Sequence, residues 1–201
     1  MDIQRASSVA GRALCKAAQT HWEGKCDEML FLDLELAGSL PHLRISNAQR
    51  VMQNGLHSGC LLTHLDTRGE FGRSFELTRR HLQSVPRRHT LITGINDYAV
   101  LGALRAFEEA GRSSSCLAVS YGGGPEARGE LRLPNTRLIA AVAFFPERYG
   151  ENLLLLALDI LNKRAAPPAV YMPLQLLTRK NVDQFYPHDT STRVGEESAR
   201  S

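Results

Sequence analysis

The sequence predicts an α/β fold in which a doubly wound parallel sheet carries helices on both faces. Short apolar segments alternate with helical patterns from residue 9 to residue 121, which is the β–α rhythm of a parallel sheet. Hydrophobic residues make up 43% of the chain and charged residues 22%, as in ordinary globular proteins. The 201 residues suffice for one large domain. No apolar run approaches the roughly 20 residues of a membrane span, so none is predicted.

Strands are expected where short apolar runs lie between turn residues. They fall at 29–34, 61–65, 90–95, 117–121 and 138–145, with a last extended segment at 169–178. Helices are expected where apolar residues recur at helical spacing, at 9–20, 43–54, 72–84, 98–110 and 146–163. Pro86 ends the third helix, because the residue before a proline avoids the helical region. Gly111 is the expected residue just after the fourth.

The end of the chain departs from the β–α rhythm. In the helix at 146–163, the leucines at 153–156 make most of the circumference apolar, which is typical of a helix buried on several sides. Residues 188–201 are polar and lack aromatic side chains. Such a composition predicts a disordered tail.

Several classes of function are disfavoured by composition and motifs. The net charge is +3 and no Lys/Arg stripe is present, so nucleic-acid binding by this chain is not indicated. Cys15, Cys26, Cys60 and Cys116 form no C-x-x-C pair and have no histidine at zinc spacing, which favours buried or half-buried thiols over a metal site. The glycines at 122–124 lack G-x-G-x-x-G spacing, and no catalytic motif is present. We therefore expect no enzyme, no catalytic residue and no cofactor.

Asn96 and Asp97 stand at the most informative position of the chain. They follow an apolar strand and open a helix, at the edge where open α/β sheets bind small ligands. The Asn96 amide offers one donor side and one acceptor side to a ligand, but asparagine is equally favoured as a helix N-cap, and both roles stay open. Asp97 is better suited to capping the helix or to stabilising its dipole than to contacting a ligand.

Several short motifs, taken in order, resemble type I periplasmic binding proteins of the sugar ABC transporter branch and the effector domains of the lac-repressor family. They are Val9-Ala10-Gly11-Arg12-Ala13-Leu14, Ala37-Gly38 followed by Arg44, the Asn96-Asp97 turn, Val119-Ser120-Tyr121-Gly122-Gly123, and the segments 146–150 and 181–187. The resemblance covers the second, C-terminal lobe, and the first lobe has no counterpart. It implies a truncated solute-binding lobe for a sugar or small polar ligand, with weak binding and a role in carbohydrate transport. The alternative is the effector-binding domain of a lac-repressor-type regulator without its DNA-binding headpiece.

The resemblance marks five candidate ligand-binding residues and no metal ligand. They are Arg44, Asn96, Asp97, Gly122 and Phe144. Arg44 would supply a forked hydrogen-bond donor to the ligand. The alternative interpretation is a surface arginine with no ligand role. Gly122 and Phe144 stand where an aspartate and a glutamine are common in the family, and Ala6-Ser7 replace Asp-Asn. These changes remove polar groups from the cleft, although Phe144 is able to stack on a sugar face or pack in the core.

The expected organisation is a second-lobe domain at 1–145, a C-terminal helix with the final hinge or strand segment at 146–187, and the tail at 188–201. In the family the last long helix packs on the first lobe. We therefore expect an ABC transporter permease or a separately encoded first lobe as partner, or self-association through 146–163. The resemblance implies a periplasmic location, yet residues 1–5 show no apolar signal-peptide region, so a chain that truly starts at Met1 would stay in the cytoplasm.

Overall fold

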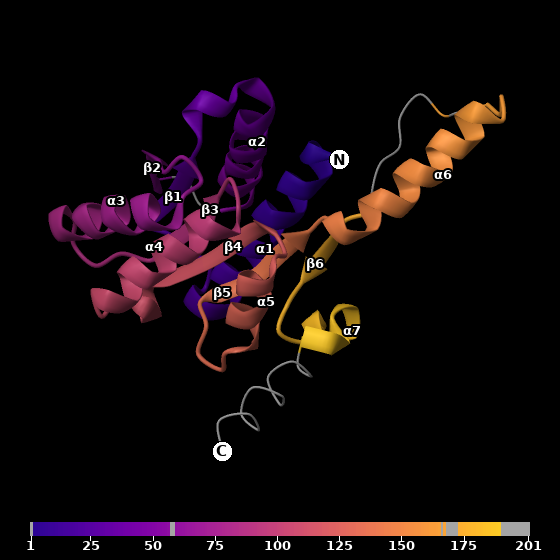
Figure 1. Ribbon diagram of the computed structural model, residues 1–201. Coiled ribbons are helices and arrows are strands. Elements are labelled where there is room, and N and C mark those ends of the chain that lie inside the picture. The colour runs from indigo at the N-terminus through magenta and orange to yellow at the C-terminus, as the bar shows by residue number, and fades with distance from the viewer. Residues whose placement is uncertain (1, 57–58, 166, 168–172, 190–201) are drawn as a thin grey trace, which may run out of the picture.

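The computed structural model describes residues 2–56, 59–165, 167 and 173–189 and shows one mixed sheet flanked by helices (Figure 1). The strands are β1 (Glu28–Asp33), β2 (Leu61–Asp66), β3 (Thr90–Gly94), β4 (Cys116–Gly122), β5 (Leu138–Ala143) and β6 (Gln175–Leu177). Their order is β2-β1-β3-β4-β5-β6. Neighbours from β2 to β5 run parallel, and β6 pairs antiparallel with β5. The predicted doubly wound parallel sheet is confirmed.

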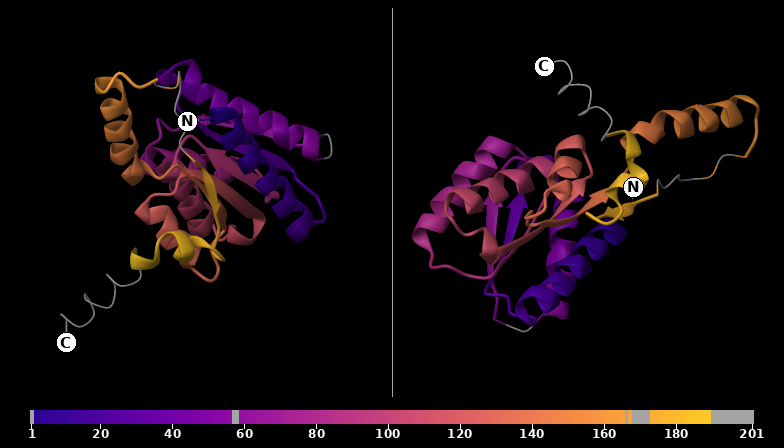
Figure 2. Two further views of the ribbon diagram at one scale, coloured as in Figure 1. Left: turned by 90° about the vertical axis from the view of Figure 1, so that its right-hand side faces the viewer. Right: turned by 90° about the horizontal axis from the view of Figure 1, so that it is seen from below.

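Helices cover both faces of the sheet, as Figure 2 shows. The long helices are α1 (Ile3–Trp22), α2 (Ser39–Gly55), α3 (Phe71–Ser84), α4 (Asp97–Glu109), α5 (Pro125–Arg132) and α6 (Tyr149–Leu161). Alternate residues of a strand point to opposite faces. Met29 and Phe31 therefore pack in the core beneath α1. Leu30 and Leu32 pack in the core beneath α4 and α5.

The largest differences from the sequence prediction are at α1 and α5, while α2 begins four residues early, at Ser39, and α6 begins three residues late, at Tyr149. Helix α1 begins six residues before the expected start, because the Asp2 side chain caps it by accepting from the Arg5 N–H at 2.9 Å. Helix α5 was not predicted at all, since the preceding glycines looked like a plain turn. Pro125 opens it, as proline suits a first helical turn. Ala127 and Leu131, one helical turn apart, bury its inner face.

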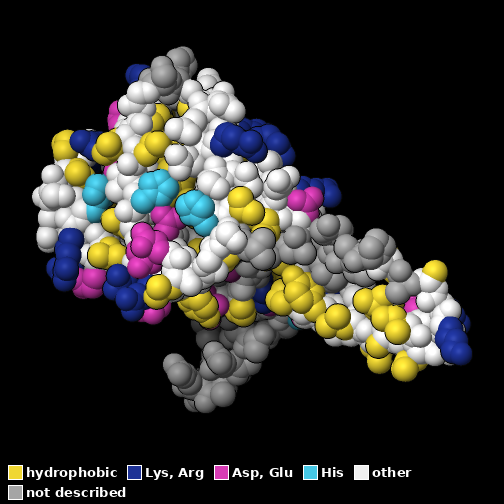
Figure 3. Space-filling model, turned by 90° about the horizontal axis from the view of Figure 1, so that it is seen from above, with side chains coloured by type: hydrophobic (Ala, Val, Ile, Leu, Met, Phe, Trp, Pro, Cys, Tyr) yellow, Lys and Arg dark blue, Asp and Glu magenta, His cyan; other side chains and the backbone are white. Residues whose placement is uncertain are grey.

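Helix α6 follows a short 3-10 turn (Pro146–Arg148) and projects from the body of the fold (Figures 1 and 2). None of its residues is buried, so the expected burial on several sides is not found. Figure 3 shows hydrophobic side chains gathered along this projection. Within the described residues, no helix combines the length and apolar character needed to cross a bilayer.

The last described segment folds back onto α5. It contains α7 (Val182–Phe185) and a 3-10 turn (Pro187–Asp189), which includes the first two residues, His188 and Asp189, of the predicted tail. Arg128 donates from Nε and Nη2 to the two carboxylate oxygens of Asp189, at 2.6 and 3.1 Å. Its guanidinium carbon lies 3.8 Å from the centroid of the Tyr186 ring. Residues 190–201 of the expected tail and residues 169–172 of the expected last extended segment lie outside the described residues.

Candidate functional site

All five candidate residues lie at the carboxyl edge of the sheet. Arg44 comes from α2, Asn96 and Asp97 follow β3, Gly122 ends β4, and Phe144 follows β5. The parallel strands β1, β3, β4 and β5 end side by side, which is why residues distant in sequence meet here. This is the position where open α/β sheets bind their ligands.

Arg44 is the centre of this cluster. Its guanidinium carbon lies 5.0 Å from the centroid of the Tyr121 ring and 5.3 Å from that of Phe144. One of its terminal nitrogens donates to the backbone carbonyl of Ile95, at the end of β3. Burial lowers the pKa of Arg44, while attraction to Tyr121 and Asp97 opposes this. The group nevertheless stays a cation at neutral pH, because arginine starts far above that range. It is a fixed, charged, forked donor lying over two aromatic rings.

Asn96 serves the fold with both ends of its amide. Its oxygen accepts from the Ala99 N–H at 2.9 Å and so caps α4. Its nitrogen donates to the Gly69 carbonyl, also at 2.9 Å, and ties β3 to the loop after β2. The structure thus shows the capping role that the sequence left open. A role in contacting a ligand stays a prediction.

Asp97 is buried, with 7% of its surface exposed, and ties α4 to the loop after β4. One carboxylate oxygen accepts from the Ser120 hydroxyl at 2.6 Å and the other from the Gly124 N–H at 2.8 Å. Burial raises the pKa of Asp97, and these hydrogen bonds offset the rise only in part. Its negative charge also helps to hold the Arg44 cation nearby. These contacts make Asp97 a positioning residue of the edge.

Gly122 and Phe144 lie on either side of this arrangement. Gly122 has φ of 137°, in the region that favours glycine, and an added Cβ would collide with the Asp97 carboxylate. A side chain in the place of the family's aspartate therefore has no room here. Phe144 is half-buried, packs against the core beneath α1 and presents its ring to Arg44. The structure thus shows the core packing, and stacking of Phe144 on a ligand stays a prediction.

The same edge holds a polar group that sequence reasoning missed. A hollow of about 190 Å³ lies beside β1 and β2 and is lined by Asp33, Leu34, Glu35, Pro41, His42, Ile45 and His64. His64 Nδ1 lies 2.6 Å from an Asp33 carboxylate oxygen, and the His64 ring stacks on Phe31 at 4.9 Å. Tyr121, which lies under Arg44, was missed as well. Asp33 and Tyr121 stand at the carboxyl ends of predicted strands, and this location is the feature of the sequence from which both could have been identified.

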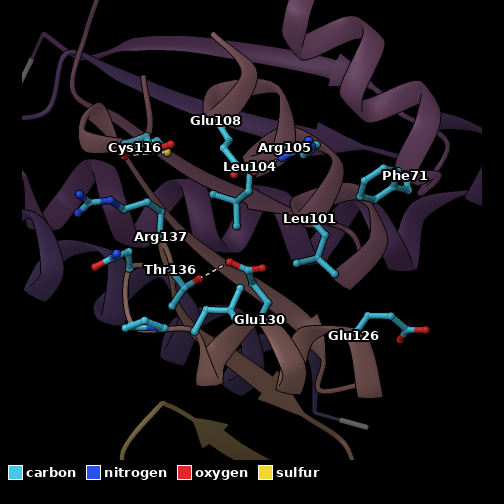
Figure 4. A pocket seen from close by; sticks show the side chains of 14 residues that line it. Phe71, Leu101, Leu104, Arg105, Glu108, Cys116, Glu126, Glu130, Thr136 and Arg137 are labelled. Atoms are coloured by element: carbon cyan, nitrogen blue, oxygen red, sulfur yellow. Dashed lines mark hydrogen bonds and ion pairs between the residues drawn. The ribbon is translucent and has the colours of Figure 1, made fainter. Parts of the chain in front are cut away.

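A larger hollow of about 520 Å³ lies away from this edge, between α4 and α5 (Figure 4). Its carboxylates already have partners within the fold. Thr136 donates to Glu130 at 2.5 Å, and the two side chains face each other in Figure 4. Arg105 donates to Glu108 at 2.5 Å, and the Tyr98 hydroxyl donates to Glu126 at 3.3 Å. We therefore keep the carboxyl edge as the candidate site.

Comparison with known proteins places the fold. No protein-family model and no curated protein match the sequence. Among solved structures, an ABC transporter periplasmic solute-binding protein from Actinobacillus succinogenes with bound D-allose superposes with a TM-score of 0.80 at 18% identity, over 92% of this chain and 61% of that one. A solute-binding protein from Agrobacterium vitis with bound alpha-D-tagatopyranose gives 0.76 at 16% identity, over 90% and 58%. GanP, a glucose-galactose binding protein from Geobacillus stearothermophilus, gives 0.76 at 16%, over 90% and 61%.

These likenesses cover nearly all of this chain but less than two thirds of each solved structure. At such low identity they establish the fold and leave the ligand open. The chain therefore has the α/β lobe fold of the type I solute-binding proteins of sugar ABC transporters, over about 60% of their length.

Proposed function

We propose that this chain is a solute-binding lobe that takes a sugar or another small polar ligand and is related to the substrate-binding proteins of ABC transporters. The observation that carries the proposal is the Arg44 guanidinium over Tyr121 and Phe144 at the carboxyl edge of the sheet. A sugar presents hydroxyl oxygens, which accept from a forked donor, and an apolar ring face, which packs on an aromatic side chain. Arg44 and Phe144, both half-buried, offer these two kinds of partner, whereas Tyr121 is fully buried and lies against Arg44.

The names of the similar structures support the ligand class. Those proteins carry D-allose, alpha-D-tagatopyranose or myo-inositol, or are described as glucose-galactose binding. All of these are small polyhydroxylated molecules. We extend only this shared chemistry to the present chain. A periplasmic location and a transporter permease as partner follow from the same relationship and belong to the proposal.

The proposed binding by this lobe alone is weak. The hollow of about 190 Å³ at this edge lies beside β1 and β2, and neither Arg44 nor Phe144 lines it. Good ligand pockets span roughly 300–1,000 Å³ and bury about 70–90% of the ligand. A monosaccharide seated on Arg44 would leave its other face in water. Tight binding therefore needs a second surface, which we propose to be a first lobe encoded separately or joined to this one.

The test is a titration of the full chain, labelled with ¹⁵N, against pentoses, hexoses and polyols. We expect millimolar affinity for at least one sugar, with shifts confined to the first turns of α2 and to the amides at the ends of β3, β4 and β5 and in the loops that follow them. Shifts that centre on the groove between α4 and α5, or no shifts with any of these compounds, would contradict the proposed site. Micromolar affinity of the monomer in calorimetry would contradict the argument from the open edge.

A further inference from the structure

Three thiols gather at the amino edge of the sheet, opposite the candidate site. Cys15 lies on α1, Cys26 shortly precedes β1, and Cys60 directly precedes β2. All three are half-buried and pack against the core beneath α1. The fourth cysteine, Cys116, is fully buried at the start of β4. Its thiol donates to the backbone carbonyl of Ser113.

Cys26 and Cys60 are direct neighbours within this group. The Cys60 thiol donates to the backbone carbonyl of Cys26 at 2.8 Å, and the Cys26 thiol donates to the Glu28 carbonyl at 3.4 Å. The two side chains also interact directly, and this interaction helps to raise the pKa of Cys26, as expected when the Cys26 thiol donates toward the Cys60 sulfur. Cys15 is less engaged, since its sulfur lies 4.0 Å from the Met52 carbonyl.

The backbone around Cys26 and Cys60 suits a covalent link. Strands β1 and β2 run parallel with Glu28 opposite Leu61, and the Leu61 N–H donates to the Asp27 carbonyl at 2.9 Å. Adjacent strands lie about 4.8 Å apart. Continuing this register places Cys60 opposite Asp27, next to Cys26 in the chain. Disulfides join Cα atoms roughly 4.4–6.8 Å apart, so a diagonal link between Cys26 and Cys60 falls within reach.

Two other uses of these thiols fit less well. Among the described residues, no group of three His, Cys, Asp or Glu side chains is arranged to hold a metal ion. A catalytic cysteine needs a lowered pKa, whereas burial and the adjacent Cys60 raise the pKa of Cys26. Disulfide formation needs a neighbouring sulfur, and a small thiolate fraction slows it without preventing it, because the rate follows the fraction of thiolate present.

We propose that Cys26 and Cys60 form an intramolecular disulfide when the folded protein meets a peroxide. One thiolate attacks a peroxide oxygen and becomes a sulfenic acid, releasing water after proton uptake. The second thiol then displaces the sulfenic oxygen as water and forms the S–S bond. Two thiols and one hydrogen peroxide thus give one disulfide and two waters, with the sulfurs oxidised by two electrons and the peroxide reduced.

The bond would fasten the edge strand β2 to β1. Among the described strands β2 pairs only with β1, and its Leu61 and Leu62 are 46% and 37% exposed. The link would close the chain from residue 26 to residue 60 and so restrict the unfolded state. Because it lies at the opposite edge from Arg44, it should leave the candidate site unchanged. The inference is therefore independent of the proposed function.

The experiment is peptide mapping of the full chain after native oxidation with hydrogen peroxide and alkylation. Trypsin places the four cysteines in separate peptides, 13–16, 26–44, 51–68 and 113–128. We expect peptides 26–44 and 51–68 to appear joined in the monomer fraction, and to separate after reduction. The oxidised monomer should also melt higher than the reduced one by roughly 5 °C or more, given the length of the closed loop.

Serine variants decide the pairing. Cys26→Ser and Cys60→Ser should each abolish the joined peptides, whereas Cys15→Ser and Cys116→Ser should retain them. A link from peptide 13–16 to either partner in the wild type would overturn the proposal. So would four alkylated thiols after oxidation, or a link found only between two chains.

Discussion

The Asp97 carboxylate occupies the space that any side chain at Gly122 would need. The backbone at Gly122 has φ of 137°, and an added Cβ would meet the nearer Asp97 oxygen well inside contact distance. Asp97 in turn is fixed there by Ser120 and by the Gly124 N–H. The end of β4 and the start of α4 therefore depend on each other, and a carboxylate at both positions would be excluded by contact and by charge.

Replacing Gly122 should be costly for this reason. We expect Gly122→Ala to lower the free energy of unfolding by about 2–6 kcal/mol, because backbone strain and overpacking each contribute roughly 1–3 kcal/mol. Urea denaturation measures it. Gly111→Ala is the matched control, since Gly111 has φ of 63° but an added Cβ would find nothing within 4 Å. Its cost should be about 1 kcal/mol. Equal costs for the two variants would show that Asp97 is not the obstacle.

The sheet could be predicted from the sequence because its strands are short apolar runs between turn residues. Every strand from 29–34 to 138–145 is found within about two residues of its predicted bounds, which is the usual uncertainty of such boundaries. Helix α5 could not be predicted from the sequence, because only Ala127 and Leu131 of its eight residues are buried. Two apolar positions give too little periodicity to separate a short helix from a loop.

The site was predictable as a location but not as a set of contacts. Placement at strand ends brought Asn96, Gly122 and Phe144 together correctly. The bond from Arg44 to the Ile95 carbonyl joins residues 51 positions apart and follows from how α2 packs. Asp97 accepts hydrogen bonds from Ser120 and Gly124, which belong to the neighbouring strand β4 and to the loop after it. Local patterns carry no information about such distant pairs, so the burial of Asp97 could not be inferred.

Glu28 should make stability depend on pH. Its side chain is 1% exposed and accepts from Thr63 at 2.6 Å, with His81 Nε2 at 2.7 Å. Burial raises the pKa of Glu28, but these hydrogen bonds outweigh it, so the net pKa is lowered. A lowered folded pKa gives stability that is present above the unfolded value of about 4.3 and is lost as the pH falls through the folded one. Urea unfolding should therefore show the advantage of wild type over Glu28→Gln shrinking between about pH 5 and pH 3.

Asp97 provides the contrast for this measurement, because its pKa is raised, chiefly by burial. A raised folded pKa gives stability that is present below the unfolded value of about 3.9 and is lost as the pH rises through the folded one. The advantage of wild type over Asp97→Asn should therefore decrease with rising pH, opposite to Glu28→Gln. Parallel trends in the two variants would mean that at least one of these environments is assigned wrongly.

Arg44 and Asn96 should both matter for any ligand at the carboxyl edge. Loss of a hydrogen-bonding partner costs about 1–3 kcal/mol, so Arg44→Ala and Asn96→Ala should each weaken sugar binding by roughly 5-fold or more. Titrations followed by NMR measure this, with circular dichroism to confirm folding, since Asn96 also caps α4. Arg105→Ala is the control, because Arg105 pairs with Glu108 on the surface of α4. Unchanged affinity in both site variants would reject these assignments.

Helix α6 should drive association of the chain. Six of its large apolar side chains are 45–78% exposed: Leu153, Leu154, Leu155, Leu158, Ile160 and Leu161. Each is worth roughly 1.5–3 kcal/mol when fully buried, and contiguous apolar patches beyond a few hundred Å² are rare on soluble monomers. We therefore expect the chain to self-associate through α6 at micromolar concentration whenever no other surface, such as a first lobe, covers the helix.

Analytical ultracentrifugation with a double variant tests this expectation. Leu154→Glu/Leu155→Glu places two charges in the middle of the apolar surface, so a helix that is buried between copies should be released and the chain should sediment as a monomer. Leu36→Glu is the control, because Leu36 is 79% exposed but lies in a short turn before α2. It should leave association unchanged. A wild-type chain that is monomeric at micromolar concentration, and that binds no more apolar dye than the double variant, would show that the exposed leucines do not need a partner surface.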